Sequence, residues 1–222
     1  METSLFPESQ IQAGFAFPQS LTEKYRPRTL DAFVGLEKPK AIAQKLITRP
    51  FESAWLFLGP SGTGKTTLAM AIAELMPAEL HHVPSQECNL ANIERIRMTC
   101  QYVPMEGKRM HMVLADELDQ LTGPAQISLL SKLDSTNFFP NTLFIGTCND
   151  TTRLEPRFLS RFHIIEFSSY GIAKDVAAFL EYVWDEESNI NVNKPNFARI
   201  VKESNNNVRE SLMRLETELM CL

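Results

Sequence analysis

A glycine-rich run at residues 59–66 has the composition of a loop that binds phosphate groups. It fits the pattern GxxxxGK[ST] and reads Gly59-Pro60-Ser61-Gly62-Thr63-Gly64-Lys65-Thr66. Glycines let successive backbone N–H groups turn toward phosphate oxygens, and a following helix adds its positive end. We expect Lys65 to reach the β- and γ-phosphates of ATP and the Thr66 hydroxyl to bind Mg²⁺, with Thr67 beside the nucleotide.

Two adjacent carboxylates follow the apolar run 110–115. A strand that ends at the carboxyl edge of a parallel sheet would bring Asp116 to the metal beside the phosphate loop. Glu117 would then polarise the attacking water. Asn149 follows the apolar run 142–147 and could orient the same water through its amide; the alternative is a turn-forming Asn-Asp pair. Together these residues predict hydrolysis of ATP.

Short apolar runs alternate with helical patterns between residues 21 and 168. This alternation predicts an α/β fold, a parallel sheet with helices on both faces, which forms a base domain over residues 21–168. We expect strands at residues 55–58, 80–84, 110–115, 142–147 and 163–167, and helices at residues 37–48, 65–76, 90–102 and 124–134. The phosphate loop then follows the first strand and opens the second helix, as its chemistry requires.

The pattern becomes purely helical after residue 168, which predicts a small three-helix lid domain over residues 169–222. Apolar residues at helical spacing mark the three helices: Val176, Phe179, Leu180, Val183 and Trp184; Phe197, Ile200 and Val201; Val208, Leu212, Leu215 and Leu219. Asn207 is the expected cap of the last helix. Residues 1–20 show no periodicity, and we expect them to form a flexible arm.

The composition is that of an ordinary globular chain. Of its 222 residues, 44% are hydrophobic and 22% charged, and the net charge is −5. A mildly acidic chain has no overall attraction for nucleic acid or anionic membranes, so contact with DNA would require a local basic surface. No apolar run approaches the roughly 18 residues of a membrane span, and the first residues lack the pattern of a signal peptide. We expect a cytoplasmic or nucleoid-associated protein.

The four cysteines lie far apart in the sequence, at Cys88, Cys100, Cys148 and Cys221. No CxxC pair or nearby histidine cluster accompanies them, so neither a disulfide framework nor a zinc site is expected. Small buried thiols are the simpler interpretation.

Residues 21–220 resemble AAA+ ATPases, and in particular clamp-loader subunits of the replication factor C type. The run 23–35, which reads EKYRPRTLDAFVG, is similar to the family's box that lines the adenine pocket. The resemblance implies that Tyr25, Arg26, Pro27 and Val34 contact the nucleotide. The sequence ends at Leu222, after the lid, whereas clamp-loader subunits carry a further helical collar domain.

The same resemblance assigns roles to three polar residues outside the phosphate loop. Asn149 corresponds to sensor 1, Arg161 to the arginine finger and Arg209 to the sensor-2 arginine. A guanidinium supplies fixed, bidentate positive charge, which suits the charge that spreads over the transferred phosphoryl group. Arg161 would complete the site of a neighbouring subunit in trans, and Arg209 would act in its own site. Arg157 is a rival for the finger.

The family implies partners as well as chemistry. It predicts a homo- or hetero-oligomer of AAA+ subunits, acting in DNA replication or repair on DNA and on a sliding clamp or another remodelled protein. A basic strip occurs where clamp loaders touch the DNA backbone, formed by Arg95, Arg97, Lys108 and Arg109. An ordinary solvated face gives the same pattern. The alternative function is a AAA+ protein remodeller or an ATP-dependent assembly switch that does not contact DNA.

Overall fold

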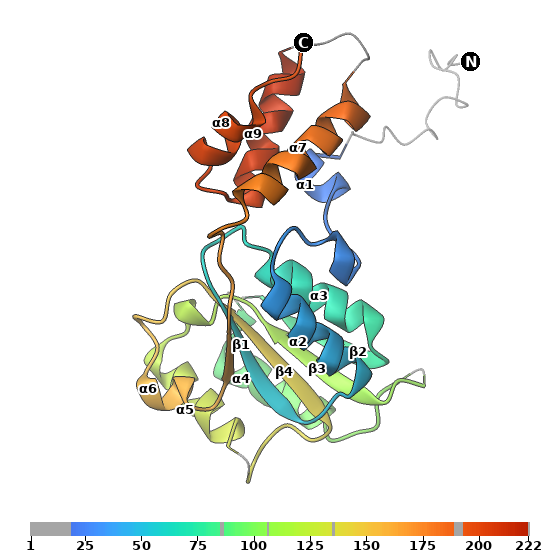
Figure 1. Cartoon of the computed structure of the whole chain (residues 1–222). Helices are drawn as coiled ribbons and strands as arrows, with labels where there is room; N and C mark the ends of the chain where they lie inside the picture. The colour runs from blue at the N-terminus through green and yellow to red at the C-terminus, as the bar shows by residue number, and fades with distance from the viewer. Residues whose placement is uncertain (1–18, 85–86, 106, 135, 189–192, 222) are drawn as a thin grey trace, which may run out of the picture.

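A computed structural model describes residues 19–84, 87–105, 107–134, 136–188 and 193–221 of the chain. The expected flexible arm, residues 1–20, therefore lies almost entirely outside the described residues. Figure 1 shows two lobes, one built around a parallel sheet and one built of helices, with α1 (Leu21–Lys24) packed beside the helical lobe. The predicted α/β class and the helical region that follows it are both confirmed.

The sheet contains five strands in the order β2-β3-β4-β1-β5, and all neighbouring strands run parallel. The strands are β1 (Ser53–Leu58), β2 (Ala78–Val83), β3 (Met110–Ala115), β4 (Thr142–Cys148) and β5 (His163–Glu166). Every residue of β3 and β4 is buried, as expected for central strands covered on both faces. Their carboxyl ends lie together, since Ala115 pairs with Gly146 and Cys148 pairs with Leu58 of β1.

Helices cover both faces of the sheet (Figure 1). The helices α2 (Glu37–Thr48) and α3 (Lys65–Leu75) pack on one face; α4 (Leu90–Thr99), α5 (Gly123–Lys132) and α6 (Pro156–Leu159) pack on the other. Successive residues of β3 alternate between them, with Met112 and Leu114 toward α3 and Val113 and Ala115 toward α4 and α5. This alternation is the period-two pattern of a strand buried on both sides.

The helical lobe contains α7 (Ala173–Glu187), α8 (Phe197–Glu203) and α9 (Val208–Met220), which correspond to the three expected lid helices. Its core joins the expected stripes around Leu180, Trp184 and Leu215. Leu21 of α1 belongs to the same core, and its backbone N–H donates to Glu216 Oε1 at 3.0 Å. No helix in the described ranges is both long and apolar enough to cross a membrane.

Candidate nucleotide-binding site

The phosphate-binding loop connects β1 to α3 and is held by the ends of two neighbouring strands. The N–H group of Gly59 donates to the carbonyl oxygen of Cys148 at 3.1 Å. Gly59 has φ 155°, and a Cβ at this position would lie 2.1 Å from the carbonyl oxygen of Phe167. Only glycine fits there, because both the backbone angle and the close approach exclude a side chain. The loop is therefore fixed between β4 and β5.

Lys65 lies inside the loop with 7% of its surface exposed. Its ammonium group donates to the carbonyl oxygens of Gly59 at 2.6 Å and Pro60 at 2.8 Å, and to Asn149 Oδ1 at 2.9 Å. Burial lowers the pKa of Lys65. A phosphate that enters the loop would form an ion pair with this ammonium group. Because the group is buried, the attraction is stronger than it would be in water. The structure thus brings Lys65 and Asn149 together, as the spacing of the motifs predicts.

Asp116 follows β3 and meets three side chains. The hydroxyl groups of Thr66 and Thr147 donate to its Oδ1 atom at 2.9 Å and 3.0 Å. His82 of β2 places Nε2 2.7 Å from the Oδ2 atom. Mg²⁺ is bound by oxygen ligands such as hydroxyl and carboxylate groups, so the predicted pair of Thr66 and Asp116 fits this ion. The contacts of Thr147 and His82 were not predicted.

Glu117 adopts a left-handed backbone conformation, with φ 53° and ψ 54°. For a residue other than glycine this conformation costs about 1–2 kcal/mol. Its N–H group donates to the Thr147 hydroxyl at 3.0 Å. The same hydroxyl therefore contacts both acidic residues. The Glu117 side chain is exposed and lines the cleft described next.

A polar cleft runs between the phosphate loop and the carboxyl ends of β3 and β4. It is lined by the sequence-predicted residues Ser61, Gly62, Gly64, Lys65, Thr66, Thr67, Asp116, Glu117, Asn149 and Arg209. Arg209 reaches the cleft from α9 of the helical lobe. Arg161 lies elsewhere on the base domain, where its Nη2 atom pairs with Asp134 Oδ2 at 3.0 Å. Arg157 is exposed and pairs with Glu155.

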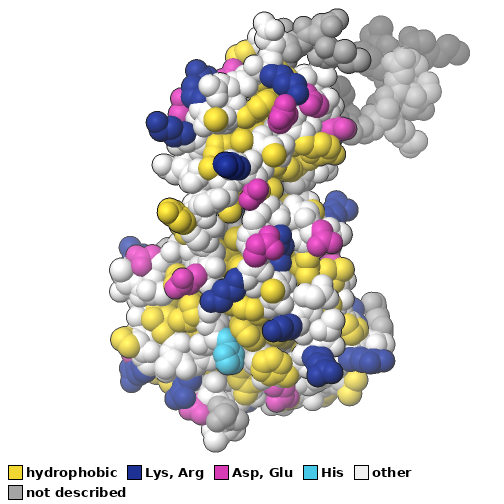
Figure 2. Space-filling view, viewed as in Figure 1, with side chains coloured by type: hydrophobic (Ala, Val, Ile, Leu, Met, Phe, Trp, Pro, Cys, Tyr) yellow, Lys and Arg dark blue, Asp and Glu magenta, His cyan; other side chains and the backbone are white. Residues whose placement is uncertain are grey.

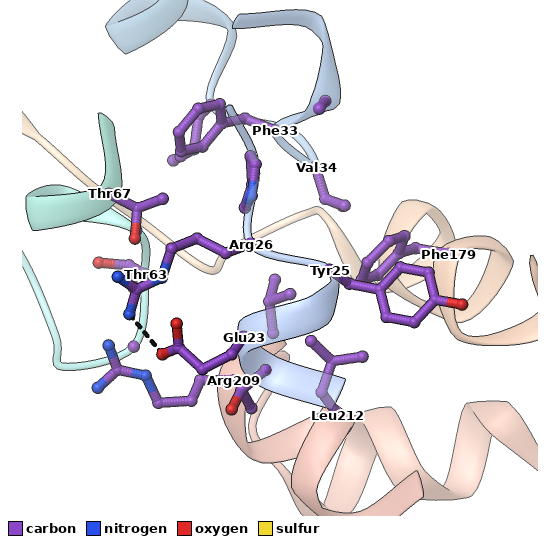
Figure 3. A pocket seen from close by; sticks show the side chains of 17 residues that line it. Glu23, Tyr25, Arg26, Phe33, Val34, Thr63, Thr67, Phe179, Arg209 and Leu212 are labelled. Carbon is purple, nitrogen blue, oxygen red and sulfur yellow. Dashed lines mark hydrogen bonds and ion pairs between the residues drawn. The ribbon is translucent and has the colours of Figure 1, made fainter. Parts of the chain in front are cut away.

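A second pocket adjoins the cleft and lies between the N-terminal segment, the phosphate loop and the helical lobe (Figure 3). Its cavity volume is about 150 Å³, and it is open to solvent on one side. Its walls include Tyr25, Arg26, Pro27, Phe33, Val34, Leu36, Thr63, Gly64, Thr67, Phe179, Val208, Arg209 and Leu212. Mostly apolar walls with a few polar groups suit a nucleoside. All four box residues expected at the nucleotide line this pocket.

Tyr25 ties the box to the helical lobe. Its ring meets Phe179 of α7 edge to face, with centroids 6.2 Å apart, and its hydroxyl donates to Glu187. Burial, followed by the contact with Glu187, raises the pKa of Tyr25 well above its usual value. Figure 3 shows the ring beside Phe179, while Arg26 pairs with Glu23 on the side nearer the phosphate loop.

Asn207 joins the helical lobe directly to the phosphate loop. Its Nδ2 atom donates to the carbonyl oxygen of Ser61 at 2.6 Å, and its Oδ1 atom accepts from the backbone N–H of Glu210 at 3.2 Å. A Cβ on Gly62 would lie 2.5 Å from that same Oδ1 atom. The sequence predicted the cap of α9, whereas the contact with the loop was missed.

The basic strip is partly neutralised. The guanidinium of Arg97 lies 3.4 Å from Glu94 Oε1 and 3.3 Å from Asn137 Oδ1. Arg95 is exposed and donates to Asn92 Oδ1 at 2.7 Å. Figure 2 shows the opposite side of the base domain, which α2 and α3 cover, with both basic and acidic side chains. The strip therefore remains a prediction of DNA contact.

Comparisons with known proteins place this site in context. The model of the ATPase family associated with various cellular activities (AAA) matches residues 55–170. Replication factor C small subunit 1 of Pyrobaculum arsenaticum is 32% identical over 153 residues, which cover 66% of this chain and 46% of that protein. Replication factor C small subunit of Haloarcula marismortui is 28% identical over 215 residues, which cover 94% of this chain and 64% of that protein.

Among solved structures, the RuvB Holliday junction branch migration motor of Thermotoga maritima aligns with a TM-score of 0.68 at 22% identity. The alignment covers 86% of this chain and 64% of that one. A likeness at this identity concerns the fold alone. The chain spans about half the length of the first curated relatives that it matches, 46% in the case of the Pyrobaculum arsenaticum protein.

Proposed function

The chain belongs to the AAA family of ATPases, and on that premise we propose that it hydrolyses ATP to ADP and phosphate with Mg²⁺. One observation carries the proposal: Lys65, Asp116 and Asn149 converge on one cleft from three separate segments of the chain. A bound Mg²⁺ would neutralise charge on the β- and γ-phosphate oxygens. The Thr66 hydroxyl and the Asp116 carboxylate are the residues that would hold it.

Each remaining residue of the cleft has a separate role in binding the phosphates or activating the water. Lys65 exchanges its carbonyl contacts for the β- and γ-phosphate oxygens. Asn149 accepts from Lys65 through Oδ1, which leaves its amide N–H groups to orient a water molecule. Glu117 carries an exposed carboxylate at the same cleft and takes a proton from that water. Arg209 adds positive charge from the helical lobe as negative charge develops on the transferred group.

We assign the adenine and ribose to the pocket between the box and the helical lobe. The support is its position beside the cleft and its apolar walls, since Val34 and Leu212 face it from the two lobes. A nucleotide bound there contacts the base domain and the lid at once. Binding of ATP would therefore change the free energy of closing the lid on the base.

The trans arginine finger is part of the same proposal. Arg161 is placed on the base domain beside Asp134, whereas Arg209 lines the cleft of its own chain. In an isolated chain, Arg209 then lies at the chain's own cleft, but Arg161, the proposed finger, does not. We propose that a neighbouring AAA+ subunit supplies the finger, in a homo- or hetero-oligomer.

The curated relatives favour a role as a clamp-loader-like motor subunit in DNA replication or repair, with DNA and a sliding clamp as partners. Such a protein would act in the cytoplasm or at the nucleoid. The second candidate is a AAA+ remodeller or assembly switch that does not contact DNA. The pairing of Arg97 with Glu94 favours it, because that pair removes positive charge from the basic strip.

The rate of ATP hydrolysis, measured with and without primed DNA, separates the two candidates. If the strip contacts DNA, primed DNA raises turnover. The logarithm of the DNA affinity then falls linearly with the logarithm of the salt concentration, with a slope of about −0.9 for each phosphate neutralised on duplex DNA. Removing charge with Arg95→Ala and Arg109→Ala should flatten that slope, whereas Arg214→Ala on the helical lobe should not. Glu117→Gln should abolish turnover with and without DNA. Absence of DNA binding at low salt with ATP present would leave the remodeller.

A further inference from the structure

Three side chains with metal-binding atoms meet at the outer edge of the sheet. His81 belongs to β2, His111 to β3, and Cys100 directly follows α4. Their ligand atoms all lie within 4.8 Å of one another. The register of β2 and β3 explains why the histidines meet. His111 pairs with Glu79, which lies two residues before His81, so the side chains of Glu79, His81 and His111 share one face of the sheet. This face is opposite to that of His82, which contacts Asp116.

The two imidazole rings place one nitrogen each toward the same point, where both could bind a metal ion. His81 Nε2 lies 3.0 Å from His111 Nδ1, and His111 Nε2 lies 2.9 Å from the carbonyl oxygen of Tyr102. An N–H at His111 Nε2 donates to that carbonyl and leaves Nδ1 as a bare lone pair. Metal-binding histidines are commonly oriented in this way by a backbone carbonyl.

Burial encloses the cluster on the protein side. Cys100 is 2% exposed and His111 is 1% exposed, while His81 is half-buried and gives access from solvent. Glu79 Oε2 lies 3.7 Å from His111 Nδ1. The group therefore contains two imidazoles and a thiol, with the Glu79 carboxylate beside one of the imidazoles. The cysteines were expected to be isolated buried thiols because the spacing in the sequence does not show this meeting.

We propose that His81, His111 and Cys100 bind a Zn²⁺ ion. Imidazole and thiolate are the donors that Zn²⁺ favours, whereas Mg²⁺ prefers oxygen. Bond lengths of about 2.0–2.3 Å place neighbouring ligands of a tetrahedral ion about 3.3–3.6 Å apart. The imidazole nitrogens, now 3.0 Å apart, would separate slightly, and the atoms up to 4.8 Å apart would approach each other. Binding moves the His81 ring proton to Nδ1 and releases the Cys100 thiol proton to solvent.

The ion would be structural, since it joins three elements and lies away from the phosphate cleft. Cys100 opens the loop that leads from α4 to β3, and the two histidines belong to the strands beneath it. This loop exposes Tyr102 and Val103, with 72% and 87% of their surfaces accessible. Bound Zn²⁺ would fix the loop on the edge of the sheet and stabilise the folded chain.

Cobalt(II) is a suitable probe, because a thiolate ligand gives it a charge-transfer absorption band. The whole chain is stripped with a chelator and titrated with Co²⁺ in excess Mg²⁺, which occupies the oxygen donors at Asp116. We expect one ion per chain with a thiolate band that Zn²⁺ abolishes. Cys100→Ser should lose the band, and Cys88→Ser, the matched buried cysteine, should keep it.

His81→Ala provides a second test at a half-buried position. It should weaken Zn²⁺ affinity by more than the roughly 10- to 100-fold that follows loss of an outer-shell partner. Added Zn²⁺ should raise the melting temperature of the wild-type chain and leave that of His81→Ala almost unchanged. A wild-type chain without a thiolate band, or a band that depends on Cys88 instead of Cys100, would overturn the proposal whether or not the variants fold.

Discussion

The hydroxyl of Thr147 holds the two acidic residues of the cleft in relation to each other. It donates to Asp116 Oδ1 and accepts from the backbone N–H of Glu117, both at 3.0 Å. Glu117 needs such support because its left-handed backbone is unfavourable for a residue with a side chain. Thr147 itself is 2% exposed, so water does not replace its hydroxyl easily. The hydroxyl therefore positions the carboxylate that we propose to receive a proton.

Thr147→Val tests this role, because valine keeps the shape and removes the hydroxyl. Each lost hydrogen bond is worth about 0.5–1.5 kcal/mol, so we expect the turnover number to fall by about tenfold. The dissociation constant of a non-hydrolysable ATP analogue should change far less, because Lys65 and the loop are untouched. Steady-state kinetics and a binding titration measure the two quantities. Thr147→Ser retains the hydroxyl and should keep most of the activity; an equal loss in both variants would point to packing instead.

At this scale the sequence predicts which residues meet but not which residues hold them. Lys65, Thr66 and Asp116 stand in local motifs whose spacing reports their chemistry, and they lie together in the cleft. His82 reaches Asp116 only because β2 and β3 are neighbours in the sheet. A contact of this kind depends on strand register, which a single sequence does not display.

The position of α9 relative to the phosphate loop depends on one side chain at its start. Asn207 caps the helix with its Oδ1 atom and holds Ser61 with its Nδ2 atom. Asn205 and Asn206 precede it with φ of 49° and 60°, a left-handed turn that asparagine tolerates better than most residues. This turn aims the cap at the loop. Arg209, in the first turn of the helix, then lines the cleft.

Asn207→Asp and Asn207→Ala separate the two contacts. Aspartate can still cap α9 but cannot donate to Ser61, and it brings negative charge toward the phosphate site. We expect Asn207→Asp to weaken ATP binding by about tenfold while the melting temperature stays near that of the wild type. Asn207→Ala loses the cap as well, which costs about 1 kcal/mol of folding stability. Thermal melts and ATP titrations of both variants provide the comparison.

If Asn207→Asp bound ATP as tightly as the wild type, the contact with Ser61 would have no role in nucleotide binding. The cap would then be the whole function of Asn207. Asn207→Ser is a useful third variant, because serine caps helices well and carries no charge.

At the scale of elements, hydrophobic periodicity predicts the sheet and the long helices but not their ends. The helix expected at residues 90–102 ends at Thr99, and the chain then turns so that Cys100 is buried against the strands. The helix expected from residue 124 begins at Gly123, since Pro124 suits the first turn of a helix. The short helices α1 and α6 show too few residues for a period to be recognised.

The position of α1 follows from tertiary contacts. Leu21 is 5% exposed among the side chains of the helical lobe, and Glu216 of α9 accepts its backbone N–H. The sequence pattern places these residues in the base domain, 21–168. The boundary of residues 21–168 remains a prediction, and the N-terminal box links the two lobes by its contacts with both.

The residues proposed to bind the nucleotide come from both lobes, and Arg161, the proposed finger, lies apart from them. The pocket proposed for adenine (Figure 3) adjoins the polar cleft, since Gly62, Gly64, Thr67 and Arg209 line both. Arg161 lies in the segment between α6 and β5 and pairs with Asp134, with 38% of its side chain exposed. A guanidinium in that position can exchange a surface carboxylate for a neighbour's phosphate at little cost, because exposed ion pairs are weak.

If Arg161 is the finger, as we propose, it decides whether the chain works alone. Arginine fingers are worth on the order of 10³–10⁵ in rate at related phosphoryl-transfer sites. Arg161→Ala should lower turnover by a factor in that range and change ATP affinity little. Arg157→Ala is the matched control, because this neighbouring arginine is exposed and paired with Glu155.

Mixing two inactive variants gives the decisive measurement. Arg161→Ala keeps an intact phosphate loop, and Lys65→Ala keeps an intact finger, so an interface between them assembles one complete site. We expect the mixture to recover part of the turnover that each variant lacks, and recovery should rise with protein concentration because the site needs two chains. A mixture as inactive as its components, with wild-type turnover per chain independent of concentration, would contradict the trans arrangement. If Arg157→Ala alone abolished turnover, the finger would belong to Arg157, and Arg161 would serve the structure through Asp134.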